Sequence, residues 1–259
     1  TYKSKFVVQI FVSLLLVYGG CRIGNLGGLF GIHTVPVAVG AVLTVLVCVL
    51  LMNAYNLIDG IDGLCSGLSL LTLGALGIWF TWNNLYVYGI MVAGIVGVVS
   101  VFFFYNVSGN RMKIFMGDTG SLTLGYLIAF FGLKFYNMNV ETAMFNTPAA
   151  PAAPAAPAVF LGMVFIPVFD TIRVFFVRIK AGLSPFYPDK RHIHHKMLRL
   201  GLNHFQSSMT IIFMQACFVV LNVLLKDINI NILFFLDLIL GFIMIYVIDL
   251  LGKRNKKLV

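Results

Sequence analysis

Charged side chains are scarce in this sequence of 259 residues, of which they make up 10%, and only nine of them are acidic. Apolar residues supply 60% of the chain, and the mean hydropathy is +0.97. A soluble domain cannot hide so much hydrocarbon from water, so that class is excluded. With about 20 apolar residues per crossing, the length leaves room for about eight helices. We therefore expect an all-α fold, a polytopic transmembrane helical bundle forming one domain over residues 1–259.

Paired cysteines and a nucleic-acid-binding surface are also missing. The four cysteines, Cys21, Cys48, Cys65 and Cys217, have no CxxC or Cys/His ligand spacing and lie in or beside apolar runs, which is typical of packing residues. The net charge of +9 comes from Lys and Arg in loops rather than on an amphipathic or aromatic-interleaved face. We expect no nucleic-acid partner, and a lipid bilayer around the chain instead.

Eight apolar runs are the candidate spans, at 6–18, 35–51, 68–82, 85–105, 122–135, 159–177, 207–225 and 230–251. If the N-terminus is cytoplasmic, fifteen of the eighteen basic residues fall on the cytoplasmic side. Because Lys and Arg are retained on that side during insertion, this orientation is favoured. A Pro/Ala-rich segment, 146–158, then lies outside, and its composition predicts polyproline II or disorder.

A first polar cluster reads NAYNLIDGIDG and runs from Asn53 to Gly63, at the inner end of the second span. Asn53, Asn56 and Asp59 are three residues apart, so on a helix they form one polar stripe. Together with Asp62 they suit ligation of Mg²⁺-bound water, of phosphate-linked hydroxyls or of a basic partner. A helix end capped by Asn and Asp is the simpler interpretation.

A second cluster, IFMGDTGS, precedes the fifth span. Its glycines permit close backbone approach, Asp118 is a ligand type for a hard cation, and the N–H groups of the following helix start attract anions. Mg²⁺ prefers one or two carboxylates together with phosphate oxygens and waters, which such a segment offers. An ordinary N-cap turn is the alternative.

A third cluster, SPFYPDKRHIHH, lies in the long inner loop. It holds three of the five histidines, His192, His194 and His195, beside Lys190 and Arg191. These residue types fit contacts with phosphate groups. A zinc site is less favoured, because no Cys or carboxylate stands at a suitable ligand spacing nearby. A solvated basic loop is a further alternative. Outside the clusters, Asp170 either completes a polar cavity on the inner side of the membrane or pairs with Arg173. Pairing is favoured.

The three motifs, in this order, resemble the polyprenyl-phosphate N-acetylhexosamine-1-phosphate transferases of glycosyltransferase family 4. The HIHH form is most similar to bacterial undecaprenyl-phosphate N-acetylglucosaminyl 1-phosphate transferases. The resemblance implies an enzyme of the EC 2.7.8 type in the bacterial inner (cytoplasmic) membrane, with its active site on the cytoplasmic face. Its partners would be a UDP-N-acetylhexosamine and undecaprenyl phosphate, its product would start a lipid-linked glycan, and UMP would be released. A homodimer is left open.

The resemblance also implies residue roles. Asp118 would ligate Mg²⁺, for which Mn²⁺ is a substitute. The catalytic group would be Asp59, Asp62, Asp118 and His194. The substrate-binding group would be Asn53, Asn56, Asn106, Phe115, Arg191, His192 and His195, with Phe115 stacking on uracil.

One departure from the family pattern concerns an upstream aspartate motif, DDxxD, because this chain has no Asp before Asp59. Since the first residue is Thr1, we expect a chain that lacks its first spans and that is inactive without the motif. Two other functions stay open. One is a transporter or channel that uses Asp170 and Asp237, and the other is a truncated, non-catalytic homologue.

Overall fold

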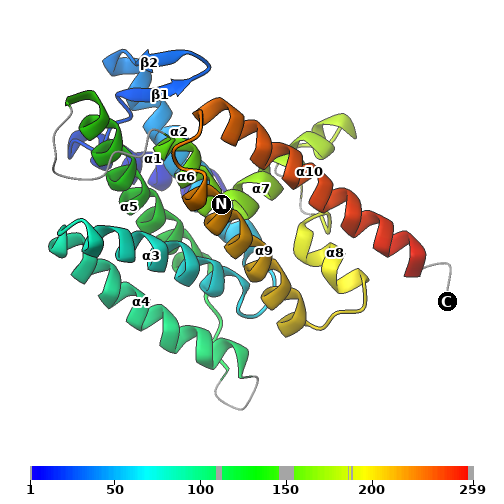
Figure 1. Ribbon diagram of the computed structural model, residues 1–259. Helices are drawn as coiled ribbons and strands as arrows, with labels where there is room; N and C mark the ends of the chain where they lie inside the picture. The colour runs from blue at the N-terminus through cyan, green and yellow to red at the C-terminus, as the bar shows by residue number, and fades with distance from the viewer. Residues whose placement is uncertain (1, 109–112, 146–154, 186, 188, 256–259) are drawn as a thin grey trace.

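Helices dominate the computed structural model, which describes residues 2–108, 113–145, 155–185, 187 and 189–255 (Figure 1). The elements in chain order are α1 (Tyr2–Tyr18), β1 (Asn25–Leu29), β2 (Ile32–Thr34), α2 (Val37–Ile58), α3 (Leu64–Trp82), α4 (Tyr86–Val107), α5 (Gly117–Phe145), α6 (Ala156–Met163), α7 (Phe165–Lys180), α8 (Ile193–Arg199), α9 (His204–Leu224) and α10 (Ile230–Asn255). The long helices lie side by side in a bundle, with α3 packed along α4 and α2 along α5.

Five helices in the described part of the chain are long and apolar enough to cross a membrane: α2, α3, α4, α9 and α10. The bent pair α6 and α7 raises this to six if it counts as one span. The expected eight are therefore not found. The apolar part of α1, Ser4–Tyr18, is shorter than the other spans. α5 carries Lys134 and Asn139 in its second half and is not among the candidates. The chain is a multi-pass membrane protein.

A small hairpin departs from the all-α expectation. β1 and β2 pair antiparallel, with Leu29 opposite Ile32, so Phe30 and Gly31 form a two-residue turn. Both turn residues have positive φ, 53° and 76°, as the right-handed twist of hairpin strands requires. Phe30 is held there because its N–H donates to Asn231 Oδ1 at 2.7 Å and its ring packs edge-on against Phe234. The hairpin lies at the opposite end of the bundle from α8 (Figure 1).

The expected single span at 159–177 is broken at Val164, where α6 and α7 meet at 79°. Pro167 explains the break, because proline has no N–H and its ring clashes with the carbonyl four residues earlier. Gln215 of α9 satisfies the freed backbone: Ile166 N–H donates to its Oε1 at 2.8 Å, and its Nε2 donates to Gly162 O at 2.7 Å.

The Pro/Ala segment 146–158 was expected to be polyproline II or disordered. Residues 146–154 lie outside the described residues. At its end the expectation is wrong, because Ala156, Pro157 and Ala158 form the first turn of α6. Proline is tolerated there since the first N–H groups of a helix have no intrahelical partner.

Candidate active site

A cavity of about 380 Å³ opens where α2, α4, α5 and α9 meet the loops that join them. It is lined by Asn56, Asp59, Gly60, Ile61, Asp62, Asn106, Lys113, Phe115, Met116, Gly117, Asp118 and His204. The first and second motifs therefore line one site, although fifty residues separate them in the chain. Three of the nine acidic residues of the chain line it.

Asn56 and Asp118 join the two motifs. α2 ends at Ile58 with Asp59 as its C-cap, and Asp118 stands in the first turn of α5. Asn56 Nδ2 donates to Asp118 Oδ1 at 3.0 Å and to Ser121 Oγ at 2.9 Å. The amide thereby fixes one carboxylate oxygen, and the Lys5 ammonium of α1 donates to the other.

Asp62 lines the same cavity as Asp118 and contacts the side chains of a lysine and a histidine. Lys113 Nζ donates to its Oδ2 at 2.6 Å, and His204 Nδ1 lies 3.3 Å from the same oxygen. The Lys113 ammonium also lies 5.3 Å from the centre of the Phe115 ring. That ring is 76% exposed, so one face of the cavity is an uncovered aromatic surface beside a cation.

Asn106 fixes the distance between the motif loops. Its Oδ1 accepts from Gly63 N–H at 2.6 Å, and its Nδ2 donates to Ile114 O at 2.8 Å. Gly63 has φ of 75°, a left-handed conformation that glycine adopts without strain. The side chain of a single buried asparagine thus pins both loops to the end of α4.

The electrostatics of the cavity act most strongly on Asp59. The pKa of Asp59 is raised to about 6, first by burial and then by the neighbouring carboxylates of Asp118 and Asp62. A carboxyl that is buried beside two others resists ionisation, because its charged form loses solvation and is repelled by the like charges.

The third motif lies behind this cavity rather than on its wall. His194 is 2% exposed, and a β-carbon added to Gly60 would overlap its Nε2, so the imidazole packs directly on the Gly60 backbone. Its Nδ1 has no hydrogen-bond partner among the described residues. Burial lowers the pKa of His194 to about 3 and also lowers that of His195, so His194 stays neutral at physiological pH.

Three predicted substrate-binding residues have other contacts in the structure. Asn53 Nδ2 donates to Gln9 Oε1 at 2.9 Å, which joins α2 to α1 away from the cavity lining. Arg191 pairs with Asp189 at 3.4 Å, and His192 is buried against Asp170. The predicted pair between Asp170 and Arg173 is confirmed, at 2.6 Å.

Sequence reasoning missed Lys5, Lys113 and His204. The two lysines were used only to orient the chain in the membrane, although Lys113 stands two residues before Phe115 in the second motif. His204 lies outside the three motifs and was not among the predicted site residues. Nothing local in the sequence indicates that the first residue of α9 reaches Asp62, because this contact spans 142 positions.

A family model described as Glycosyl transferase family 4 matches residues 1–136, more than half of the chain. The chain belongs to glycosyl transferase family 4. The matched part of this family 4 chain contains the first two motifs and ends before the third.

Curated relatives agree with the family. An undecaprenyl-phosphate alpha-N-acetylglucosaminyl 1-phosphate transferase of Pasteurella multocida is 32% identical over 128 residues, 48% of this chain and 31% of the relative. A probable undecaprenyl-phosphate N-acetylglucosaminyl 1-phosphate transferase of Bacillus subtilis is 33% identical over 156 residues, 60% of this chain and 40% of the relative. A decaprenyl-phosphate N-acetylglucosaminephosphotransferase of Mycobacterium leprae is 33% identical over 95 residues, 37% and 24% respectively. The matched stretch of this family 4 chain thus spans less than half of each of these relatives.

The donor set of this family 4 site fits Mg²⁺ better than zinc. Among the described residues, no three His, Cys, Asp or Glu side chains converge as metal ligands. Mg²⁺ needs no such cage, because it binds one or two carboxylates and takes its remaining ligands from waters and substrate phosphates. Asp118, which is 58% exposed and already oriented by Asn56, is the carboxylate best placed to do so.

Proposed function

We propose that the full-length protein transfers N-acetylglucosamine-1-phosphate from UDP-N-acetylglucosamine to undecaprenyl phosphate and releases UMP. The observation that best supports this proposal is the cavity. In it, two motifs that are separated in sequence bring Asp59, Asp62 and Asp118 together with Lys113. Family membership and the names of the relatives support the reaction class.

In this reaction an oxygen of the lipid phosphate attacks the β-phosphorus of the nucleotide sugar. The bond from this phosphorus to the oxygen bridging to the α-phosphate breaks, and UMP leaves with that oxygen. The product is a lipid-linked diphosphate sugar. Such a transfer demands mainly positioning and charge neutralisation, which a polar cavity with carboxylates and lysines is suited to provide.

A bound Mg²⁺, held by Asp118, would neutralise charge that develops on the diphosphate. Lys5 and Lys113 now neutralise Asp118 and Asp62, and their ammonium groups are positioned to turn to phosphate oxygens when a donor enters. Phe115, exposed beside Lys113, offers a stacking face for the uracil ring.

A second cavity supports an acceptor with a long apolar chain. It measures about 470 Å³, is lined by aromatic and aliphatic side chains of α6, α7 and α10, and has Arg173 and Lys180 among its lining residues. Arg173 also donates to Arg191 O in the third motif, at 2.7 Å. An apolar cavity with two cations in its lining suits an isoprenoid chain that ends in a phosphate.

The excess of basic residues on the side of the motifs supports an orientation with the site in the cytoplasm of a bacterial cell, at its inner membrane. UDP-sugars are made on that side, so donor and site would meet.

The test is UMP release by the purified full-length protein in lipid nanodiscs. We expect release only when UDP-N-acetylglucosamine, undecaprenyl phosphate and Mg²⁺ or Mn²⁺ are all present, and none with EDTA. An absence of UMP release with every UDP-N-acetylhexosamine, or UMP release without the lipid phosphate, would contradict the proposal.

A further inference from the structure

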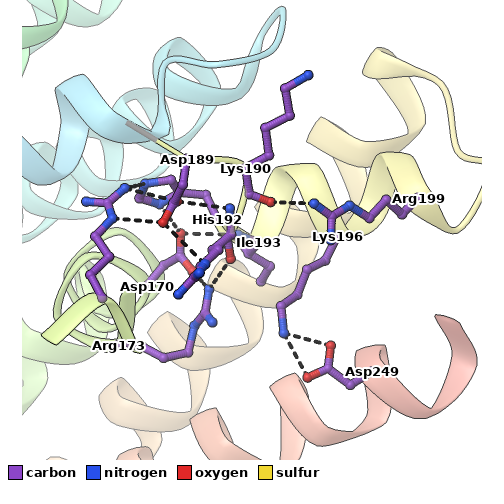
Figure 2. Close-up of polar contacts among 11 residues, drawn as sticks. Asp170, Arg173, Asp189, Lys190, His192, Ile193, Lys196, Arg199 and Asp249 are labelled. Atoms are coloured by element: carbon purple, nitrogen blue, oxygen red, sulfur yellow. Dashed lines mark hydrogen bonds and ion pairs between the residues drawn. The ribbon is translucent and has the colours of Figure 1, made fainter. Parts of the chain in front are cut away.

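Asp170 lies outside all three motifs, yet its carboxylate receives hydrogen bonds from several parts of the third (Figure 2). Its side chain is 3% exposed. His192 Nδ1 lies 2.8 Å from Oδ2, Ile193 N–H lies 3.2 Å from both oxygens, and Arg173 Nη2 donates to Oδ1 at 2.6 Å. A carboxylate of α7 therefore holds the start of α8, the helix that carries His194 and His195.

The contacts of His192 decide which ring nitrogen carries the hydrogen. Its Nε2 lies 3.5 Å from Arg178 Nη2, and a guanidinium group can only donate. Arg178 is itself fixed, because its Nε and Nη2 donate to the two oxygens of Asp189 at 3.0 and 3.1 Å. Nε2 is therefore the acceptor, and Nδ1–H donates to Asp170. Both nitrogens of His192 are engaged by the protein itself.

The orientation of His192 is passed on to the cavity through direct contacts. The rings of His192 and His194 are nearly parallel, at 4°, with centroids 5.7 Å apart. His194 in turn packs on Gly60, which lines the cavity between Asp59 and Asp62. An unbroken chain of contacts thus leads from Asp170 to the acidic wall of the site.

We infer that Asp170 is a positioning residue for the transfer reaction: it fixes the Nδ1–H tautomer of His192 and thereby sets His194 against the Gly60 loop. The inference rests on the proposed function. It assigns His192 a supporting role and leaves His194, which packs on Gly60, as the histidine of this motif that contacts the cavity lining. Carboxylates that orient a functional histidine in this way are known to matter almost as much as the histidine.

The structure supplies a matched control. Asp249 of α10 also holds α8, since Lys196 Nζ donates to its two oxygens at 2.7 and 2.8 Å (Figure 2). This pair is exposed and contacts none of the histidines through its carboxylate. Asp249→Asn removes one carboxylate charge that holds the same short helix, as Asp170→Asn does, but does not touch His192.

In the full-length protein we expect Asp170→Asn to lower kcat by about 10- to 100-fold, and Asp249→Asn to lower it by less than about fivefold. Added to His192→Gln, Asp170→Asn should cost no further activity, because its effect passes through that ring. Equal losses for the two Asn variants, or additive losses in the double variant, would overturn the inference.

A readout that needs no transfer activity is nitrogen-15 NMR of labelled histidines. The His192 signal, assigned by its loss in His192→Gln, should report an Nδ1–H tautomer that Asp170→Asn removes and Asp249→Asn keeps. An unchanged His192 tautomer in Asp170→Asn refutes the inference whether or not the protein transfers sugar phosphate. An inactive unsubstituted protein refutes the proposed function alone.

Discussion

Gly60 is the residue at which the third motif touches the first. The His194 ring occupies the space that any β-carbon at this position would need. The requirement for glycine here is thus steric, and it couples a histidine buried behind the site to the carboxylates on its wall.

Gly60→Ala should therefore displace His194 or the loop and lower turnover by about 10²-fold, the size of loss that small misplacements cause. Gly94→Ala is the control, because a β-carbon there meets open space. The comparison requires initial rates of UMP release at equal amounts of folded protein. Equal rates for both variants would show that the His194 contact is dispensable.

The pKa of Asp59 should set the acid limb of the pH–rate profile. Its pKa is raised to about 6, so the carboxylate is lost as the pH falls through that value, and activity that needs the anion falls with it. Because a cation competes with the proton for this carboxylate cluster, a higher Mg²⁺ concentration should move the limb to lower pH. A profile flat between pH 5 and 8 at limiting Mg²⁺ would contradict this role, since one unit on either side of the pKa changes ionisation about tenfold.

At the scale of elements, the break between α6 and α7 is the feature that most needs support from a neighbour. Backbone groups released inside a membrane cannot turn to water, so another side chain must satisfy them. Gln215, fully buried on α9, does so with both ends of its amide.

Gln215→Leu should destabilise the protein by about 1–3 kcal/mol, since it leaves one buried N–H and one buried C=O without that partner. Thermal unfolding in detergent measures this as a lower Tm. The control is Phe213→Leu on the exposed face of the same helix, which should change Tm little. An unchanged Tm for Gln215→Leu would mean that the break is satisfied in another way.

The sequence predicts some elements well and others poorly, for identifiable physical reasons. Hydropathy locates α2, α3, α4, α9 and α10 because each is a continuous apolar run. It cannot show the bend at Val164, which depends on Pro167 and on a distant glutamine. The hairpin at 25–34 is also missed, because its short strands have no clear alternation and its turn places a phenylalanine at positive φ.

The sequence predicts those residues of the candidate site that belong to short, continuous motifs. Asp59, Asp62 and Asp118, which the motifs place on one side of the membrane, line one cavity. The contacts of Lys5 and His204 were not predictable, because each joins residues more than a hundred positions apart. Tertiary packing alone brings these residues to the site.

At the scale of the whole molecule, Asp170 and Asp237, the two acids that a transport path would use, each have a protein partner. Asp237, fully buried in α10, accepts from Asn222 Nδ2 at 2.9 Å, and Asp170 is bound to Arg173 and His192. A transport path needs exchangeable charges along the membrane, whereas these two serve helix contacts. The cavity at one end of the bundle is the better candidate for chemistry.

The central claim is that this cavity transfers a sugar together with its attached phosphate. The most direct test gives the full-length protein UDP-N-acetylglucosamine labelled with phosphorus-32 in the β-phosphate, undecaprenyl phosphate and Mg²⁺. We predict that the label moves into the lipid fraction while unlabelled UMP is released, and that Asp118→Asn abolishes both. Label that stays in the nucleotide, appears as free phosphate, or still moves in Asp118→Asn would contradict the account.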